Sequence, residues 1–361
     1  MFRILITDTK YKHAIALARY LKKDLPEVHL TAQWKQPTRV PRWYACFDDF
    51  QLGTPLDEVL NHGGFSMVIP VGAGSVLKVS RACAHLAVLP SLESLESAYD
   101  KVKTLAIAAR LGIPVPKTQF VRDPKELVPD AVTFPAVVKL SREGAADNVV
   151  GYCYTIEEVK REVEHRLRGL RDDTGVLVQE FIPGGGCGFF ALFHNGMPLR
   201  IFMHERLREF PPSGGPSTAA RSIYSTRLRE LGLKLLSELK WNGVAMVEFR
   251  LDSRSHDFVL MEVNGKFWGS LELGLHAGVN FGADLVRLFR GEKLSYSEDY
   301  DRDLSFFWPL DGDIRSLWHR GAMGRMVVDY RRQNTATNLG QSLRADIWKT
   351  VRLFRDLVVT R

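Results

Sequence analysis

The chain has 361 residues, of which 45% are hydrophobic and 25% charged, a composition that is typical of a folded protein and excludes a disordered or fibrous one. At about 150 residues per domain, this length predicts two to three domains. No apolar run reaches the ~18 residues that cross a bilayer. The N-terminal stretch lacks the apolar core and cleavage site of a signal peptide, so we expect a cytoplasmic protein with no transmembrane segment.

The net charge of +7 is concentrated at one end of the sequence. Residues 311–361 contain ten Lys and Arg against five Asp, which is +5 of that total. The other residues are nearly neutral, and we therefore do not expect nucleic acid as the main partner. The basic segment is either a solvated helical face or a contact for an acidic surface.

The first 70 residues alternate between short apolar runs and segments with helical periodicity, which predicts an open parallel sheet covered by helices. The segment Gly72-Ala73-Gly74 follows a strand but lacks the third glycine of a dinucleotide fingerprint. The expected elements are strand 3–6, helix 9–23, strand 29–34, helix 56–61 and strand 66–71.

The middle of the chain mixes longer helices with isolated strands. A long helix is expected over 91–110, because Gly112 and the prolines at 114 and 116 terminate it. The Pro- and Gly-rich segment 211–216 predicts a loop. The other expected elements are strand 134–140, helix 155–170, strand 175–182, helix 227–239 and strands 244–250 and 258–263.

Two alternating runs within residues 243–269 form the most informative segment. Folding them as a hairpin around Ser255 places Glu248 opposite Glu262, with Asn264 next on the same face. Like charges directly opposite each other destabilise a sheet, so a cation is expected between them. Oxygen ligands with open positions suit Mg²⁺, and we predict that these three residues bind it. The alternative is a polar sheet face without a metal.

Four basic residues accompany these elements. Arg250 and Lys266 flank the carboxylates, where a reaction of phosphate or carboxylate groups needs positive charge. Lys139 ends an apolar strand, and Lys101 begins a helix after Asp100. A lysine in an apolar strand is costly unless it is paired or used, and a phosphate is a natural partner for it.

In this order the motifs resemble those of the ATP-grasp superfamily, most closely its carboxylate–amine ligases and carbamoyl-phosphate-synthase-like members. The resemblance covers about residues 90–290. The matching segments are Asp100-Lys101 with Leu-Gly-Ile-Pro-Val-Pro, Phe-Pro-Ala-Val-Val-Lys139, Val-Gln-Glu180-Phe-Ile-Pro-Gly, a Gly-rich loop before Arg221, Val-Glu248-Phe-Arg, and Met-Glu262-Val-Asn264-Gly.

This resemblance implies a mixed α/β and α+β architecture. A Rossmann-like pre-ATP-grasp domain would be followed by a two-lobed ATP-grasp fold and a basic, partly helical C-terminal extension. The expected domains are residues 1–92, lobe A at 93–175, lobe B at 176–295 and the extension at 296–361.

The resemblance also implies roles for individual residues. Lys101 and Lys139 would contact the nucleotide phosphates, and Arg221 would meet the γ-phosphate and the acyl phosphate. Arg250 and Lys266 would act with Arg221 on the reacting groups. The adenine would lie against Met261 and the strand between the lobes, whose residues are Gln179, Glu180, Phe181 and Ile182. One or two Mg²⁺ ions, with Mn²⁺ as a substitute, would bridge the phosphates.

The sequence departs from the family pattern at three places. The glycine-rich phosphate loop is reduced, with a single glycine in residues 141–146. An acidic residue for the ribose is absent after the strand between the lobes, where the sequence is Gly-Gly-Gly-Cys-Gly at 184–188. Lys266 stands where an arginine is frequent two places after the metal-binding Asn, which weakens a bidentate clamp on a carboxylate.

The expected reaction is amide formation from a small carboxylate and a small amine through an acyl phosphate, with release of ADP and phosphate. The alternative is a catalytically reduced module that binds Mg-ATP and has a regulatory or scaffold role. A nicotinamide-dependent oxidoreductase is a further alternative, which the missing fingerprint disfavours.

Overall fold

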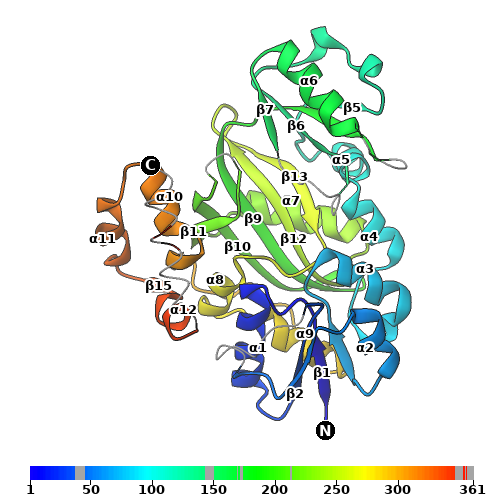
Figure 1. Ribbon diagram of the computed structural model, residues 1–361, viewed down its shortest axis with the longest axis vertical. Helices are drawn as coiled ribbons and strands as arrows, with labels where there is room; N and C mark the ends of the chain where they lie inside the picture. Colours follow the sequence, from blue (N-terminus) through cyan, green and yellow to red (C-terminus); the bar gives the residue numbers. More distant parts are fainter. Residues whose placement is uncertain are drawn as a thin grey trace.

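In the computed structural model, the described residues are 1–36, 45–142, 150–168, 170, 174–211, 214–345, 353 and 355. They form three sheets stacked along the long axis of the molecule (Figure 1). No helix within these ranges is long and apolar enough to cross a membrane.

The N-terminal sheet is parallel, with strand order β3-β2-β1-β4. This confirms the open parallel sheet predicted from the alternation of apolar runs. Its elements are β1 (Arg3–Ile6), α1 (Lys12–Asp24), β2 (His29–Trp34), β3 (Asp49–Leu52), α2 (Leu56–His62), β4 (Met67–Ile69) and α3 (Ala73–Ala82).

The helix predicted over 91–110 is two helices, α4 (Leu92–Tyr99) and α5 (Lys101–Arg110). Asp100 separates them in an extended conformation, and its carboxylate accepts hydrogen bonds from the N–H groups of Val102 and Lys103. An aspartate that caps a new helix in this way also ends the preceding one, although the apolar periodicity continues across it. Position 101 therefore lies in the first turn of a helix.

A small antiparallel sheet with order β5-β8-β6-β7 forms the upper lobe in Figure 1. Its elements are β5 (Thr118–Val121), β6 (Ala136–Leu140), β7 (Gly151–Cys153), α6 (Ile156–Leu167) and β8 (Val176–Glu180). Residues 176–180 are part of the segment expected in lobe B. They pair instead with β5 and β6, because the apolar run of β8 completes the buried core of this sheet.

The large sheet has order β13-β12-β9-β10-β11-β14-β15. Its strands are β9 (Gly184–His194), β10 (Met197–Glu209), β11 (Ser217–Ser222), β12 (Gly243–Asp252), β13 (Phe258–Asn264), β14 (Ser305–Phe307) and β15 (Thr335–Thr337). The accompanying helices are α7 (Thr226–Glu238), α8 (Leu271–His276), α9 (Phe281–Phe289), α10 (Asp313–His319), α11 (Gly324–Tyr330) and α12 (Leu339–Ala345).

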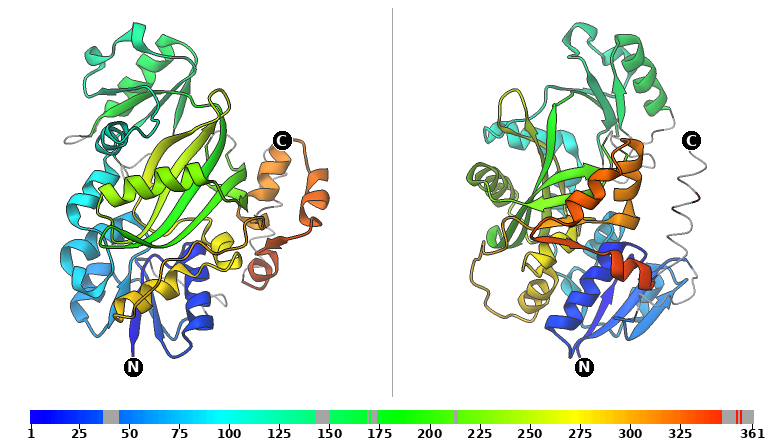
Figure 2. Two further views of the ribbon diagram at one scale, coloured as in Figure 1. Left: turned by 180° about the vertical axis from the view of Figure 1, so that it is seen from behind. Right: turned by 90° about the vertical axis from the view of Figure 1, so that its left-hand side faces the viewer.

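The two faces of the large sheet pack against different partners. One face carries Phe189, Phe193 and Val247 and packs with α4, α5 and α7, and the last of these crosses the sheet in Figure 2. The other face carries Phe190 and Met246 and shares a core with the N-terminal sheet, α8 and α9. The N-terminal sheet is therefore held against the face of the large sheet on which Glu248 lies.

The described part of the C-terminal segment belongs to the large sheet. Strand β14 pairs with β11, and β15 extends the sheet beyond it. Arg208 of β10 forms buried ion pairs with Asp313 at 2.7 Å and Asp329 at 2.5 Å. Residues 305–345 are therefore built into the fold, whereas the extension from residue 346 onwards lies mostly outside the described residues.

Candidate active site

Two carboxylates stand opposite each other on β12 and β13. In the antiparallel register Glu248 pairs with Glu262 and Met246 pairs with Asn264, which confirms the predicted hairpin. Asn264 donates from Nδ2 to the Glu262 carboxylate at 2.9 Å. The three side chains that we predicted as metal ligands therefore lie in one patch.

A cation contacts each of these three side chains. One cation comes from β10, one from the start of α5, and one from the segment just after β13. The pairs are Arg206 with Glu248 at 2.6 Å, Lys101 with Glu262 at 3.5 Å, and Lys266 with the Asn264 amide oxygen at 3.0 Å. The patch is therefore held together by alternating charges.

The two carboxylates have pKa values shifted in opposite directions. Burial raises the pKa of Glu248, against the lowering effect of Arg206, and the charge of Glu262 raises it further. Burial also acts to raise the pKa of Glu262, but Lys101 and Lys139 together hold that pKa below its usual value. Glu262 is therefore the carboxylate that stays ionised most readily, and an added cation would stabilise the ionised form of both.

Two lysines near the patch have lowered pKa values. Burial lowers the pKa of Lys139 to about 8, although Glu262 and Glu248 act to raise it. Burial, together with the charge of Lys101, lowers the pKa of Lys266 to about 8. Lys139 and Lys101 both interact with the Glu262 carboxylate, as expected for cations that bind an anionic ligand at this patch.

Arg206 is a site residue that the sequence analysis missed. It lies on β10, and Gly186 of β9 separates it from β12 in the register. A Cβ added at Gly186 would lie 2.9 Å from Cδ of Arg206, so a side chain there would block its path to Glu248. The glycine run that lacks a ribose-binding acid thus has a structural reason, because it lets Arg206 cross β9.

Arg221 is the arginine that the resemblance assigns to the γ-phosphate. Its guanidinium pairs with Glu205 at 2.5 Å and with Asp303 at 3.7 Å. Arg221 pairs with Glu205, and Glu205 pairs with Cys187 of β9, whereas Glu248 pairs with the next residue of β9, Gly188. Because successive residues of a strand face opposite sides of a sheet, Arg221 and Glu205 face the side away from Glu248. Arg221 therefore does not share the face of the three predicted metal ligands, whereas Arg206 does.

Arg250 supports the strand between the lobes. Its Nε donates to the Ile182 carbonyl at 2.9 Å, its Nη2 donates to the Gly184 carbonyl, and its guanidinium lies 5.6 Å from the centre of the Phe181 ring. Arg250 therefore contacts the strand between the lobes, and its predicted catalytic role stays a prediction.

The end of β8 has a backbone group available for a ligand. The Phe181 N–H donates to the Pro135 carbonyl and the Glu180 N–H to the Lys117 carbonyl. The Gln179 side chain is tied to Thr118 at 2.8 Å. Within the described ranges, the N–H of Ile182, just past the end of β8, has no hydrogen-bond acceptor in the protein and can donate to a ligand.

Met261 interrupts the alternation of β13. The register shifts there, because Glu248 pairs with Glu262 while Phe249 already pairs with Leu260, which leaves Met261 as an extra residue. At such a bulge strict alternation no longer applies. Alternation therefore does not assign Met261 to the face opposite Glu262, and its predicted contact with adenine remains a prediction.

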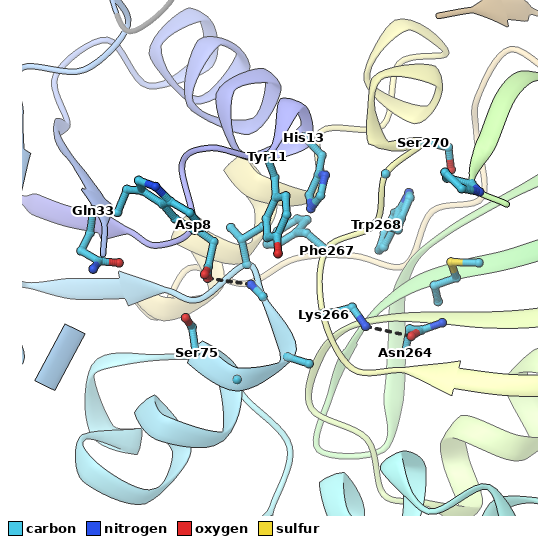
Figure 3. Close-up of a pocket in the computed structure, with 18 of the residues that line it drawn as sticks. Asp8, Tyr11, His13, Gln33, Ser75, Asn264, Lys266, Phe267, Trp268 and Ser270 are labelled. Carbon is cyan, nitrogen blue, oxygen red and sulfur yellow. Dashed lines mark hydrogen bonds between the residues drawn. The ribbon is translucent and has the colours of Figure 1, made fainter. Parts of the chain in front are cut away.

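A cavity of about 880 Å³ extends from this patch to the N-terminal sheet. Figure 3 shows Asp8, Tyr11 and His13 on one side of it, with Asn264 and Lys266 on the other. Trp268 and Arg206 also line it. The cavity therefore joins the carboxylate patch to the carboxyl ends of the parallel strands.

The oxygen atoms of the patch suit a Mg²⁺ ion whose remaining ligands come from elsewhere. Within the described residues there is no group of three His, Cys, Asp or Glu that could hold a metal by itself. The patch offers two carboxylates and one amide, and Mg²⁺ commonly takes only one or two protein carboxylates and completes its shell with water and phosphate oxygens. The residues fit a magnesium ion that arrives with a nucleotide.

Solved structures of similar fold span most of this chain. An L-amino acid ligase from Bacillus licheniformis matches with a TM-score of 0.61 and 16% identity, covering 80% of this chain and 73% of that chain. The biotin carboxylase domain of a 2-oxoglutarate carboxylase from Hydrogenobacter thermophilus, solved with MgADP, matches with a TM-score of 0.68 and 16% identity, covering 84% and 73%. These likenesses confirm the fold.

No family model matches the chain, but sequence comparison finds relatives with higher identity than the solved structures above. A probable alpha-L-glutamate ligase from Pseudomonas paraeruginosa (strain DSM 24068 / PA7) is 33% identical over 227 residues, which cover 59% of this chain and 70% of that protein. A urea amidolyase from Lachancea kluyveri is 26% identical over 194 residues, and the match spans only 10% of that much longer protein.

These comparisons identify the class of protein. The chain belongs to the ATP-grasp carboxylate–amine ligases, as the order of its motifs predicted. Within that class it is an ATP-dependent ligase.

Proposed function

We propose that the chain activates a small carboxylate as an acyl phosphate and joins it to a small amine, with release of ADP and phosphate. The observation that carries the proposal is the patch of Glu248, Glu262 and Asn264, whose members each contact a cation and of which Glu248 and Asn264 line a cavity. The names of the similar proteins, among them an L-amino acid ligase and a probable alpha-L-glutamate ligase, support carbon–nitrogen bond formation.

The nucleotide would lie between the small and the large sheet. The Glu180 carbonyl and the Ile182 N–H would meet the adenine edge, with Phe181 held beside it by Arg250. Lys101, which is 5% exposed, and Lys139 would contact the phosphates, because both already lie within electrostatic range of Glu262. A phosphate is a better partner for these buried ammonium groups than bulk water is.

Glu248, Glu262 and Asn264 would hold one or two Mg²⁺ ions, for which Mn²⁺ can substitute. When bound, the metal would neutralise charge on the transferring phosphoryl group. Arg206 and Lys266 contact the predicted metal ligands and line the cavity, so they would place positive charge beside the attacking carboxylate of the substrate. Phosphoryl transfer needs alignment and charge neutralisation more than covalent help from the protein.

The reaction would proceed in two steps. A carboxylate oxygen of the substrate attacks the γ-phosphorus of ATP, and the bond to the β,γ-bridging oxygen breaks to release ADP. The amine then attacks the acyl carbon, phosphate leaves, and the amine loses a proton. The cavity side chains Phe267, Trp268 and Met246 would limit the access of water to the acyl phosphate.

Two measurements test the proposal. Calorimetric titration should show ATP binding that requires Mg²⁺ and disappears with a chelator. A screen for ADP release against pooled carboxylates and amines should then show release only when both are present. ATP binding without ADP release across a broad panel would favour the module that has lost catalysis. Absence of Mg-ATP binding would refute the proposal.

A further inference from the structure

The crevice at the top of the N-terminal sheet is a position where open parallel sheets bind ligands. Strand β1 lies between β2 and β4, and the helices that follow β1 and β4, α1 and α3, pack on opposite faces of the sheet. Ligands of open α/β sheets bind at such switch points. Asp8 follows β1, Gly72 follows β4, and both line the cavity.

Asp8 is held in place at this crevice. It has a left-handed backbone with φ of 56°, an uncommon conformation for a residue other than glycine. Its Oδ2 accepts hydrogen bonds from the Gly72 N–H at 2.8 Å and the Thr7 hydroxyl at 2.5 Å. A Cβ at Gly72 would lie 3.0 Å from this carboxyl group. Both donors bind one oxygen, and Oδ1 has no partner within the described ranges.

The charge arrangement argues against an anionic ligand here. Helix α3 begins beside Asp8, and the N–H of Gly72 at its N-cap already donates to the Asp8 carboxylate. An incoming anion would meet that carboxylate. Of the cations in the cavity wall, Lys78 is paired with Asp57, Arg206 with Glu248 and Lys266 with Asn264, and Lys35 also lines the wall. The group that Asp8 is placed to receive is therefore a hydrogen-bond donor with positive charge.

Two aromatic rings accompany Asp8 in the cavity wall. Tyr11 and Trp34 are in edge contact, with ring centres 6.3 Å apart, and both line the cavity. The ammonium of Lys10 lies 5.4 Å from the centre of the Trp34 ring. Tyr11 and Trp34 therefore place aromatic rings in the cavity wall near Asp8, and ring faces attract cations.

We propose that Asp8, Tyr11 and Trp34 bind a primary ammonium group of the substrate whose other end reaches Asn264 and Glu248. Asp8 is then a specificity residue that selects amine-bearing substrates. The inference rests on the proposed function only in taking the carboxylate patch as the reacting end. Asp8 lies across the cavity from Asn264 and Lys266 (Figure 3).

The test compares matched ligands that differ by one amino group. The probes are L-phenylalanine against 3-phenylpropanoate, 4-aminobutyrate against butyrate, and 5-aminopentanoate against pentanoate, titrated by NMR against the full chain with Mg-ADP present. The variants are Asp8→Asn and, as a control, Asp57→Asn, whose carboxylate is exposed and lies outside the cavity wall. Asparagine tolerates positive φ and keeps an acceptor for Gly72, so the fold should survive.

We expect at least one amino compound to bind at least ~10-fold more tightly than the matched compound without the amino group. This is the gain in affinity that one hydrogen bond to a charged group provides. Asp8→Asn should reduce that preference to under about 3-fold, and Asp57→Asn should retain it. The inference is overturned if no probe binds, if the compounds without an amino group bind equally well, or if the preference survives Asp8→Asn. Calorimetry with Mg-ATP alone reports separately on the proposed function.

Discussion

Arg206 on β10 holds Glu248 on β12 at 2.6 Å by crossing the glycine-rich start of β9. The pair joins two strands that are not neighbours in the sheet. It fixes the orientation of one carboxylate of the site and supplies a buried positive charge beside the other.

Replacing Arg206 by Gln should lower kcat/KM for ATP-dependent turnover by at least ~100-fold. The change removes the cation next to Glu248 in a buried site, where little water is present to screen charges. Arg221→Gln is the matched comparison, since its side chain is 44% exposed and faces the other side of the sheet. That variant should change turnover less than about 3-fold. Equal losses in the two variants would restore Arg221 to the site.

Glu262→Gln should reduce kcat by at least ~100-fold, equivalent to about 2.7 kcal/mol of transition-state stabilisation. Glutamine keeps the acceptor for the Asn264 amide but loses the charge that interacts with Lys101 and Lys139. The assay is steady-state ADP release at saturating Mg²⁺, with Glu205→Gln on the opposite face as the control. Turnover near that of the unaltered protein would contradict the metal assignment.

The pKa of Lys139, lowered to about 8 by burial, predicts a pH dependence of ATP affinity. The protonated lysine attracts phosphate, so affinity should be constant below pH 8 and fall as the pH rises through that value. In Lys139→Arg the guanidinium stays charged, and the decline should disappear from that range. Titrations with Mg-ATP from about pH 6 to 9 would show this, and an identical decline in both proteins would exclude Lys139 as its source.

Asp313→Ala should lower the free energy of unfolding by about 3 kcal/mol, because it leaves the buried Arg208 with one carboxylate fewer. Asp313 is fully buried and accepts from Arg208 at 2.7 and 2.9 Å and from the Tyr330 hydroxyl at 2.8 Å. Denaturant melts would measure the change.

Asp303→Ala is the control for that experiment, since the Asp303 side chain is 81% exposed. It should leave the denaturation midpoint almost unchanged. Equal midpoints for the two variants would show that residues 305–345 do not stabilise the large sheet.

The sequence by itself determined the local structure and the metal-ligand candidates. Alternation with period two in residues 243–264 was sufficient to place Glu248 opposite Glu262, because side-chain direction in a strand follows from the backbone. The order of short motifs likewise indicated the family. The segmentation at Asp100 was missed, since apolar periodicity does not register a single capping residue.

Only the tertiary structure decided which cations surround the carboxylates. Arg206 and Arg221 lie on neighbouring strands and differ by one step of alternation relative to Glu248, so the pairing register alone selects between them. The register depends on long-range strand pairing. The position of Asp8 in the same cavity depends on how the N-terminal sheet packs against the large sheet, which is a contact between segments more than two hundred residues apart in the chain.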